Sequence, residues 1–123
     1  MTERKGPVLV VDDDADVREA IKDTLEQEGY AAAEASDGRD ALSYLRSNPP
    51  PSLILLDWNM APMNAPQFMQ EFANHPGSGD IPVVLLTADA RVEQKAESNG
   101  YAGYVKKPVK LELLLEILRR YCT

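Results

Sequence analysis

The stretch that decides the fold is Leu53-Ile54-Leu55-Leu56-Asp57, in which four apolar residues run without a break into a carboxylate. An unbroken apolar run of this length is typical of a strand that is buried on both faces of a parallel sheet. Two more runs of this kind lie at residues 8–11 and 82–86, and weaker strands are expected at residues 30–35 and 102–105. The stretch therefore predicts a doubly covered strand that ends at Asp57.

Segments with helical spacing of apolar residues lie between and after these strands. The first is expected between a cap at Asp14 or Asp16 and a stop at Gly29. The others are expected at residues 38–47, 66–74, 91–99 and 110–121. A strand followed by a helix, five times over, predicts an α/β fold in which helices cover both faces of a parallel sheet.

Length, composition and charge limit the classes of protein that this chain can belong to. It has 123 residues, 44% of them hydrophobic and 27% charged, and we expect one globular domain over residues 1–123. The net charge of −7 argues against direct binding to nucleic acid or to an anionic membrane. The single cysteine, Cys122, excludes an intramolecular disulfide and a cysteine-based zinc site, and it fits a cytoplasmic location.

Polar residues follow the expected strands at the points where the strands end. Ligands of open α/β sheets bind beyond the carboxyl ends of the strands, so these residues are candidates for one site. They are Asp12, Asp13, Asp57, Thr87 and Lys107. Although they are far apart in the sequence, the strands would bring them to one edge of the sheet.

The chemistry of these five residues points to a phosphoryl site that depends on Mg²⁺. Three carboxylates at one edge repel one another, and a divalent cation among their oxygens relieves that repulsion. Mg²⁺ is bound in proteins by a few carboxylates, several waters and a phosphate oxygen. The lysine and the threonine add a cation and a hydroxyl donor, as a phosphoryl group requires. A carboxylate can itself attack phosphorus, which would give an aspartyl phosphate.

Four motifs, taken together and in this order, are similar to those of a known family. They are Val10-Val11-Asp12-Asp13, Leu55-Leu56-Asp57 with Met60 and Met63, Leu86-Thr87-Ala88, and Gly103-Tyr104-Val105 with Lys107-Pro108. The chain resembles the receiver domains of two-component response regulators, including the chemotaxis regulators, over essentially its whole length. The resemblance implies a doubly wound, flavodoxin-like (βα)5 fold with the strand order 2-1-3-4-5, an order the alternation of elements does not fix.

The resemblance assigns a phosphoacceptor and a metal site. Asp57 would accept the phosphoryl group. Asp13 and Asp57 would bind Mg²⁺ through their carboxylates, Asn59 through its backbone carbonyl, and Asp12 mainly through water. The chain would thus be a phosphoprotein in signal transduction whose only catalysis is its own phosphorylation and dephosphorylation, and not an enzyme acting on other substrates.

The resemblance also implies a switch. Thr87 would bind a phosphoryl oxygen, and Lys107, with a cis peptide bond after it, would move from Asp57 to the phosphoryl group. Tyr104 would follow the position of Thr87. Asn59 and Asp89 would tune dephosphorylation, and an amide and a carboxylate there suggest a short-lived phosphoryl state.

The expected partners are proteins. A histidine kinase or a histidine phosphotransfer protein of a phosphorelay would supply the phosphoryl group, docking on the first helix around residues 15–19. The output face would be the fourth helix, fifth strand and fifth helix, at residues 89–121, and it would bind a downstream protein. The chain would be a monomer or a phosphorylation-dependent dimer, either on its own or within a larger regulator or hybrid kinase.

The sequence departs from the family's pattern at two places. After Asp57 the proline is displaced by one position, to Pro62, and Ala65 stands where the family has glycine. Because proline fixes φ and glycine permits a positive φ, we expect the loop at residues 61–65 to take an unusual path. At the second place, Tyr101 replaces a small residue, and we expect it to alter the partner face.

Two other functions stay open at this point. An adaptor with the receiver shape would work without phosphorylation. A phosphatase of the haloacid dehalogenase type would use Asp12 as its nucleophile, since an Asp-x-Asp pattern follows the first strand. Such a phosphatase needs a further acidic motif after the lysine, and only Glu112 and Glu116 follow Lys107. Which aspartate becomes phosphorylated separates the three functions.

Overall fold

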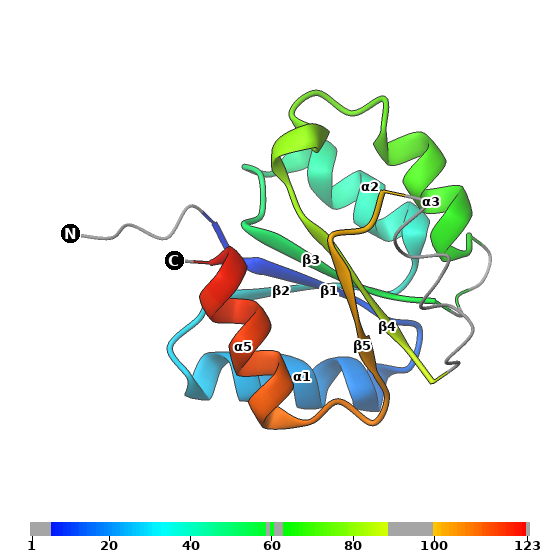
Figure 1. Cartoon of the computed structure of the whole chain (residues 1–123). Helices are drawn as coiled ribbons and strands as arrows, with labels where there is room; N and C mark the ends of the chain where they lie inside the picture. The colour runs from blue at the N-terminus through cyan, green and yellow to red at the C-terminus, as the bar shows by residue number, and fades with distance from the viewer. Residues whose placement is uncertain (1–5, 59, 61–62, 89–99, 123) are drawn as a thin grey trace.

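Five short strands form one parallel sheet in the order β2-β1-β3-β4-β5 (Figure 1). The computed structural model describes residues 6–58, 60, 63–88 and 100–122. The strands are β1 (Val8–Val11), β2 (Ala32–Ala35), β3 (Leu53–Asp57), β4 (Val83–Thr87) and β5 (Gly103–Lys106). Every neighbouring pair is parallel, which confirms the doubly wound α/β fold and the strand order 2-1-3-4-5.

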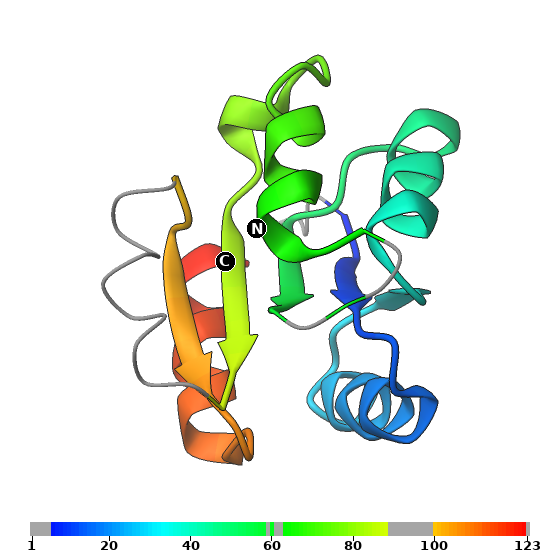
Figure 2. The ribbon, with the colours of Figure 1, turned by 90° about the vertical axis from the view of Figure 1, so that its right-hand side faces the viewer.

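Helices cover both faces of this sheet, as Figures 1 and 2 show from two directions. The helices α1 (Ala15–Gln27) and α5 (Leu111–Tyr121) lie on one face. The helices α2 (Gly38–Ser47) and α3 (Ala65–Phe72) lie on the other, and a short 3₁₀ helix, η1 (Ser78–Asp80), precedes β4. The helix expected at residues 91–99 lies outside the described residues. Within the described residues, no helix is both long and apolar enough to cross a membrane.

The apolar runs became buried strands because each strand packs against helices on both of its faces. All four apolar residues of β3 are buried: Ile54 and Leu56 pack toward α2 and α3, and Leu53 and Leu55 toward α1 and α5. Each such side chain contributes roughly 1.5–3 kcal/mol when it leaves water. This burial on both faces explains why the run carries no alternating polar residue.

Local capping fixes where two of the helices begin. The Asp14 carboxylate accepts hydrogen bonds from the backbone N–H groups of Asp16 and Val17, so Asp14, and not Asp16, caps α1. Asn64 and Gln67 form a reciprocal capping box at the start of α3. This box starts α3 at Ala65, one residue before the expected position.

Tyr101 lies in the core and not on a partner face. Only 7% of its surface is exposed, and it packs with the α2 and α3 side of the sheet. Its hydroxyl is buried and has no hydrogen-bond partner among the described residues. The expectation that Tyr101 alters the partner face is therefore wrong for its side chain, because the apolar ring is more stable inside the protein than in water.

Replacing Tyr101 by phenylalanine is expected to stabilise the protein by about 1 kcal/mol near neutral pH, because the change removes a buried hydroxyl that lacks a hydrogen bond. Burial raises the pKa of Tyr101 to about 12, whereas the pKa of a tyrosine in an unfolded chain is about 10. As the pH rises through this window the unfolded chain loses the proton first, so the wild type loses stability that the variant retains.

Urea unfolding at neutral and at alkaline pH measures both effects. Tyr121→Phe is the matched control, because the Tyr121 hydroxyl donates to the carbonyl oxygen of Ala102 at 3.2 Å. We expect the control to be slightly destabilised. A Tyr101→Phe protein that is less stable than the wild type would show that the hydroxyl has a partner in solution.

Candidate functional site

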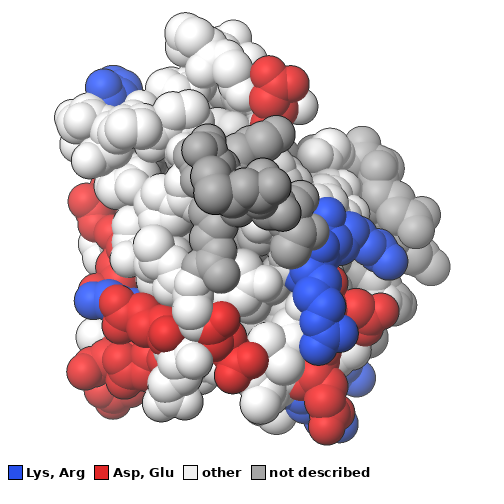
Figure 3. Space-filling model, turned by 90° about the vertical axis from the view of Figure 1, so that its left-hand side faces the viewer, with Lys and Arg blue, Asp and Glu red and all other residues white. Residues whose placement is uncertain are grey.

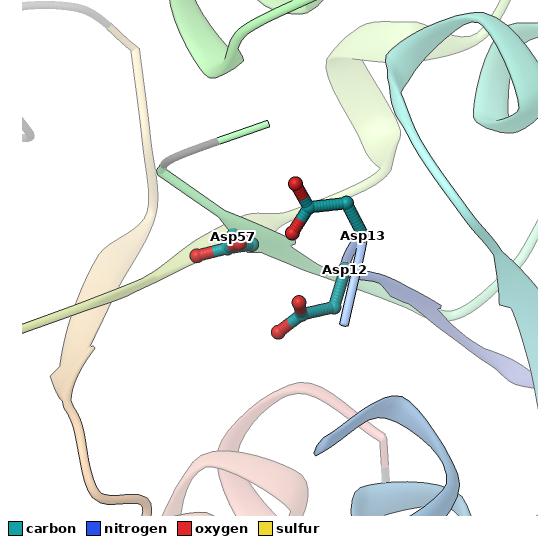
Figure 4. Close-up of side chains that lie close together, drawn as sticks. All are labelled: Asp12, Asp13 and Asp57. Carbon is teal, nitrogen blue, oxygen red and sulfur yellow. The ribbon is translucent and has the colours of Figure 1, made fainter. Parts of the chain in front are cut away.

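Three carboxylates converge where β1 and β3 end (Figure 4). Val11 pairs with Leu56 in the parallel register, so the residues that follow, Asp12 and Asp57, come to the same edge of the sheet. One carboxylate oxygen from each of Asp12, Asp13 and Asp57 lies within 4.8 Å of the others. Asp12 is 0% and Asp57 5% exposed, while Asp13 is open to solvent. The structure thus brings the three predicted aspartates together.

Lys107 joins the two buried carboxylates. Its Nζ donates to Oδ1 of Asp57 at 3.0 Å and to Oδ2 of Asp12 at 3.1 Å. Its backbone N–H donates to the carbonyl oxygen of Thr87 at 2.7 Å, which ties the loop after β5 to the end of β4. The peptide bond between Lys107 and Pro108 is cis, as the resemblance implies.

The charges around Lys107 keep it protonated. Burial by itself would lower the pKa of this ammonium. Hydrogen bonds and the negative charges of Asp57 and Asp12 outweigh that effect and hold the pKa of Lys107 above its ordinary value. One ammonium against the three carboxylates leaves two negative charges in the cluster. A cluster with this residual charge suits a divalent cation.

The backbone and side chain of Asp12 are held by several hydrogen bonds. Its Oδ1 accepts from the backbone N–H of Asp14 at 2.9 Å, and its own N–H donates to the carbonyl oxygen of Ala35 at 3.2 Å. The Nη1 atom of Arg18 donates to its carbonyl oxygen at 2.7 Å. Sequence reasoning placed Arg18 only on the expected kinase-docking face. A basic residue near the start of a helix opposes the helix dipole, and that local mismatch was the available signal.

Thr87 and Tyr104 lie on neighbouring strands. Thr87 is buried at the end of β4, next to Lys106 of β5 in the register. Tyr104 is 37% exposed and lines a groove on the outer side of β5, together with Leu113 and Ile117 of α5.

Other predicted site residues cannot be placed. Asn59, Asp89 and residues 61 and 62 of the departing loop lie outside the described residues. Trp58, the residue after Asp57, is half-buried, and its backbone N–H donates to the carbonyl oxygen of Leu86 at 3.0 Å.

The donor set fits Mg²⁺. Carboxylate oxygens are hard ligands, and two of the three aspartates are buried while Asp13 faces solvent, which leaves room for the waters that Mg²⁺ retains. Asp12 already bonds through both of its oxygens, which favours contact with the metal through water. Asp13 and Asp57 are the residues that would hold the ion directly. When bound, Mg²⁺ would draw negative charge from a phosphoryl group.

Comparison with known proteins identifies the family. The family model of the response regulator receiver domain matches residues 8–119, and the chain belongs to that family. Its members are signalling domains that bind Mg²⁺ at an acidic site and interact with histidine kinases and downstream effectors.

Relatives and solved structures agree with this assignment. The phosphate regulon transcriptional regulatory protein PhoB of Escherichia coli is 38% identical over 103 residues, which are 82% of this chain and 44% of PhoB. The response regulator MprA of Mycolicibacterium vanbaalenii is 33% identical over 114 residues, which are 91% of this chain and 48% of MprA. The chain thus spans less than half of the length of these two relatives. The structure of the chemotaxis response regulator CheY4 of Vibrio cholerae matches with a TM-score of 0.85 and 30% identity, covering 94% of this chain and 98% of CheY4.

Proposed function

We propose that this receiver domain accepts a phosphoryl group on Asp57 with the help of Mg²⁺ and then changes its affinity for a protein partner. The observation that carries this proposal is the position of Lys107. Its ammonium contacts Asp57 at 3.0 Å and Asp12 at 3.1 Å, and so links the ends of β1, β3 and β5 at one point. A structural ion pair needs only one carboxylate, whereas a site for a transferred phosphoryl group needs a carboxylate acceptor, a cation and a metal site together.

In the proposed reaction, an oxygen of the Asp57 carboxylate attacks the phosphorus of a phosphohistidine. A phosphorus–oxygen bond forms, the phosphorus–nitrogen bond breaks, and the leaving imidazole takes up a proton. Lys107 turns from the Asp57 oxygen to a phosphoryl oxygen, and the Thr87 hydroxyl donates to another. The peptide N–H of Lys107 moves with Thr87, because it bonds to the carbonyl oxygen of that residue.

The proposed switch runs from Thr87 to Tyr104. As Thr87 turns toward the phosphoryl group, it vacates space beside β5 that the half-exposed ring of Tyr104 can enter. The groove that Tyr104 lines with α5 would change shape, and a partner that reads this face would gain or lose contacts. Asn59 and Asp89 remain the residues predicted to tune the lifetime of the phosphoryl group.

The proposed donor is a histidine kinase or a histidine phosphotransfer protein that docks on α1. Acidic side chains gather on the α1 side of the face in Figure 3, and a basic cluster lies at the end of α5. The exposed acidic residues of α1 are Asp16, Glu19, Asp23 and Glu26. A donor with a basic docking surface would be attracted to them. A cytoplasmic location stays a prediction, and so does the oligomeric state, a monomer or a phosphorylation-dependent dimer.

Incubation with acetyl phosphate tests the proposal. With Mg²⁺ present, we expect the intact mass of the full chain to rise by one phosphoryl group, and we expect peptide mapping to place this group on Asp57. With the metal chelated, we expect little or no modification. Modification of Asp12 would indicate the phosphatase-type chemistry. Absence of any adduct on folded protein would favour the adaptor that works without phosphorylation.

A further inference from the structure

Arg18 connects the acidic loop to the edge of the sheet. It lies near the start of α1, and only 18% of its side chain is exposed. Its Nη1 donates to the carbonyl oxygen of Asp12 at 2.7 Å, and its Nε donates to Oε1 of Glu34 on β2 at 3.3 Å. The guanidinium thus spans from the edge strand to the backbone beside the carboxylate cluster.

This contact fixes one peptide unit of the site. The carbonyl of Asp12 belongs to the same planar peptide unit as the N–H of Asp13. A hydrogen bond that holds this oxygen therefore also orients the backbone at Asp13, and with it the direction of the Asp13 side chain. The exposed carboxylate of Asp13 has no hydrogen bond to another described residue, so its position depends on the backbone. Asp12, in contrast, has its two carboxylate oxygens held by Asp14 and Lys107.

We propose that Arg18 is a positioning residue of the metal site, which orients the peptide unit between Asp12 and Asp13 so that the Asp13 carboxylate converges with Asp57. The inference rests on the proposed Mg²⁺ site. Glu34 completes the arrangement, because it holds the other side of the guanidinium against the edge of the sheet.

The direction of the change in Mg²⁺ affinity distinguishes a positioning role of Arg18 from a purely electrostatic one. Arg18 is a cation near a site that would bind a cation, so by Coulomb's law its removal should strengthen Mg²⁺ binding. If Arg18 instead holds the ligands in place, its removal should weaken Mg²⁺ binding. The two explanations therefore predict opposite changes in affinity.

The chain offers a matched control in Lys22. This residue lies one turn further along α1 and contacts the same carboxylate, with its Nζ 3.6 Å from Oε2 of Glu34. Among the described residues, no hydrogen bond or ion pair joins Lys22 to Asp12. Lys22→Gln removes the same charge and a contact with the same glutamate, but it leaves the Asp12 carbonyl bonded to Arg18.

The experiment is a Mg²⁺ titration of the 123-residue chain as wild type, Arg18→Gln and Lys22→Gln, in which the fluorescence of Trp58 and calorimetry report binding. Trp58 is the only tryptophan and directly follows Asp57. We expect Arg18→Gln to raise the Kd for Mg²⁺ by about tenfold, the lower end of the effects of residues that support metal ligands. We expect the Kd of Lys22→Gln to be unchanged or lower.

The inference would be overturned if the Arg18→Gln protein binds Mg²⁺ as tightly as the Lys22→Gln protein, or more tightly. The proposed function would not be affected by that result. A wild type that does not bind Mg²⁺ would overturn the proposed metal site itself. Circular dichroism and the Tm without metal establish that the variants are folded. If Arg18→Gln does not fold, Arg18→Lys replaces it. A lysine keeps the charge but lacks the planar guanidinium that contacts both Glu34 and the Asp12 carbonyl. Wild-type Mg²⁺ affinity in this variant would therefore count against a positioning role.

Discussion

An Asp57→Asn protein is expected to take up no phosphoryl group from acetyl phosphate and Mg²⁺ under conditions that modify the wild type. The amide has nearly the shape of the carboxylate, so the fold should be kept. Its oxygen, however, is a far weaker nucleophile, and the amide lacks the negative charge with which the carboxylate would bind the metal. Lys107 would retain its contact with Asp12 at 3.1 Å, which limits the structural effect of the change. Intact-mass analysis measures the result directly.

Asp14→Asn is the matched control for this variant. It makes the same chemical change in the loop after β1, but at an exposed residue whose side chain caps α1. Asparagine caps a helix about as well as aspartate does, so we expect normal modification. The extent of phosphorylation of Asp13→Asn should lie between those of Asp57→Asn and Asp14→Asn, because this change removes a proposed metal ligand but not the acceptor. An Asp57→Asn protein that is modified as fully as the control would place the acceptor elsewhere.

Replacing Lys107 by alanine is expected to destabilise the metal-free protein by roughly 1–3 kcal/mol at neutral pH. The change leaves the buried carboxylates of Asp12 and Asp57 side by side without their cation. Breaking a fully buried ion pair costs roughly 3–5 kcal/mol. We expect the lower range of roughly 1–3 kcal/mol here, because 24% of the lysine side chain is exposed and water screens its charge. Mg²⁺ supplies the missing positive charge, so it should raise the Tm of this variant more than that of the wild type.

Thermal unfolding with and without Mg²⁺ measures both parts of this prediction. Lys106→Ala is the control, because it removes the neighbouring exposed lysine on β5. We expect little change in its Tm and a response to Mg²⁺ like that of the wild type. Equal Tm shifts with Mg²⁺ in Lys107→Ala and in the wild type would mean that the metal does not enter the cluster that Lys107 occupies.

Most of the fold could be predicted because its main signal is local. The runs that became β1, β3 and β4 are unbroken and apolar, and only burial on both faces makes such runs favourable. The edge strand β2 carries a weaker signal in the sequence, since three of its four residues are alanines and the fourth is the exposed Glu34. It was expected over residues 30–35 and forms over Ala32–Ala35.

The candidate site could be predicted only in part. Each aspartate follows a recognisable strand, so their meeting at one edge follows from the parallel sheet. Nothing in the local sequence indicates that one ammonium contacts both Asp12 and Asp57, because Lys107 is 95 residues from one and 50 from the other. The contact of Arg18 with the Asp12 carbonyl was missed for a similar reason, since a basic residue near the start of a helix does not show which backbone oxygen its guanidinium contacts.

By itself, then, the sequence determined the order of strands and helices, the apolar faces and the set of residues at the strand ends, because these depend on side-chain hydrophobicity and on neighbours along the chain. Tertiary structure decided which strands are adjacent, which oxygen each donor contacts, and the burial of Tyr101. These depend on how distant segments pack, where shifts of a few ångströms decide whether a hydrogen bond forms. The parallel pairing of β1 with β3 is the step that turns separate aspartates into one site.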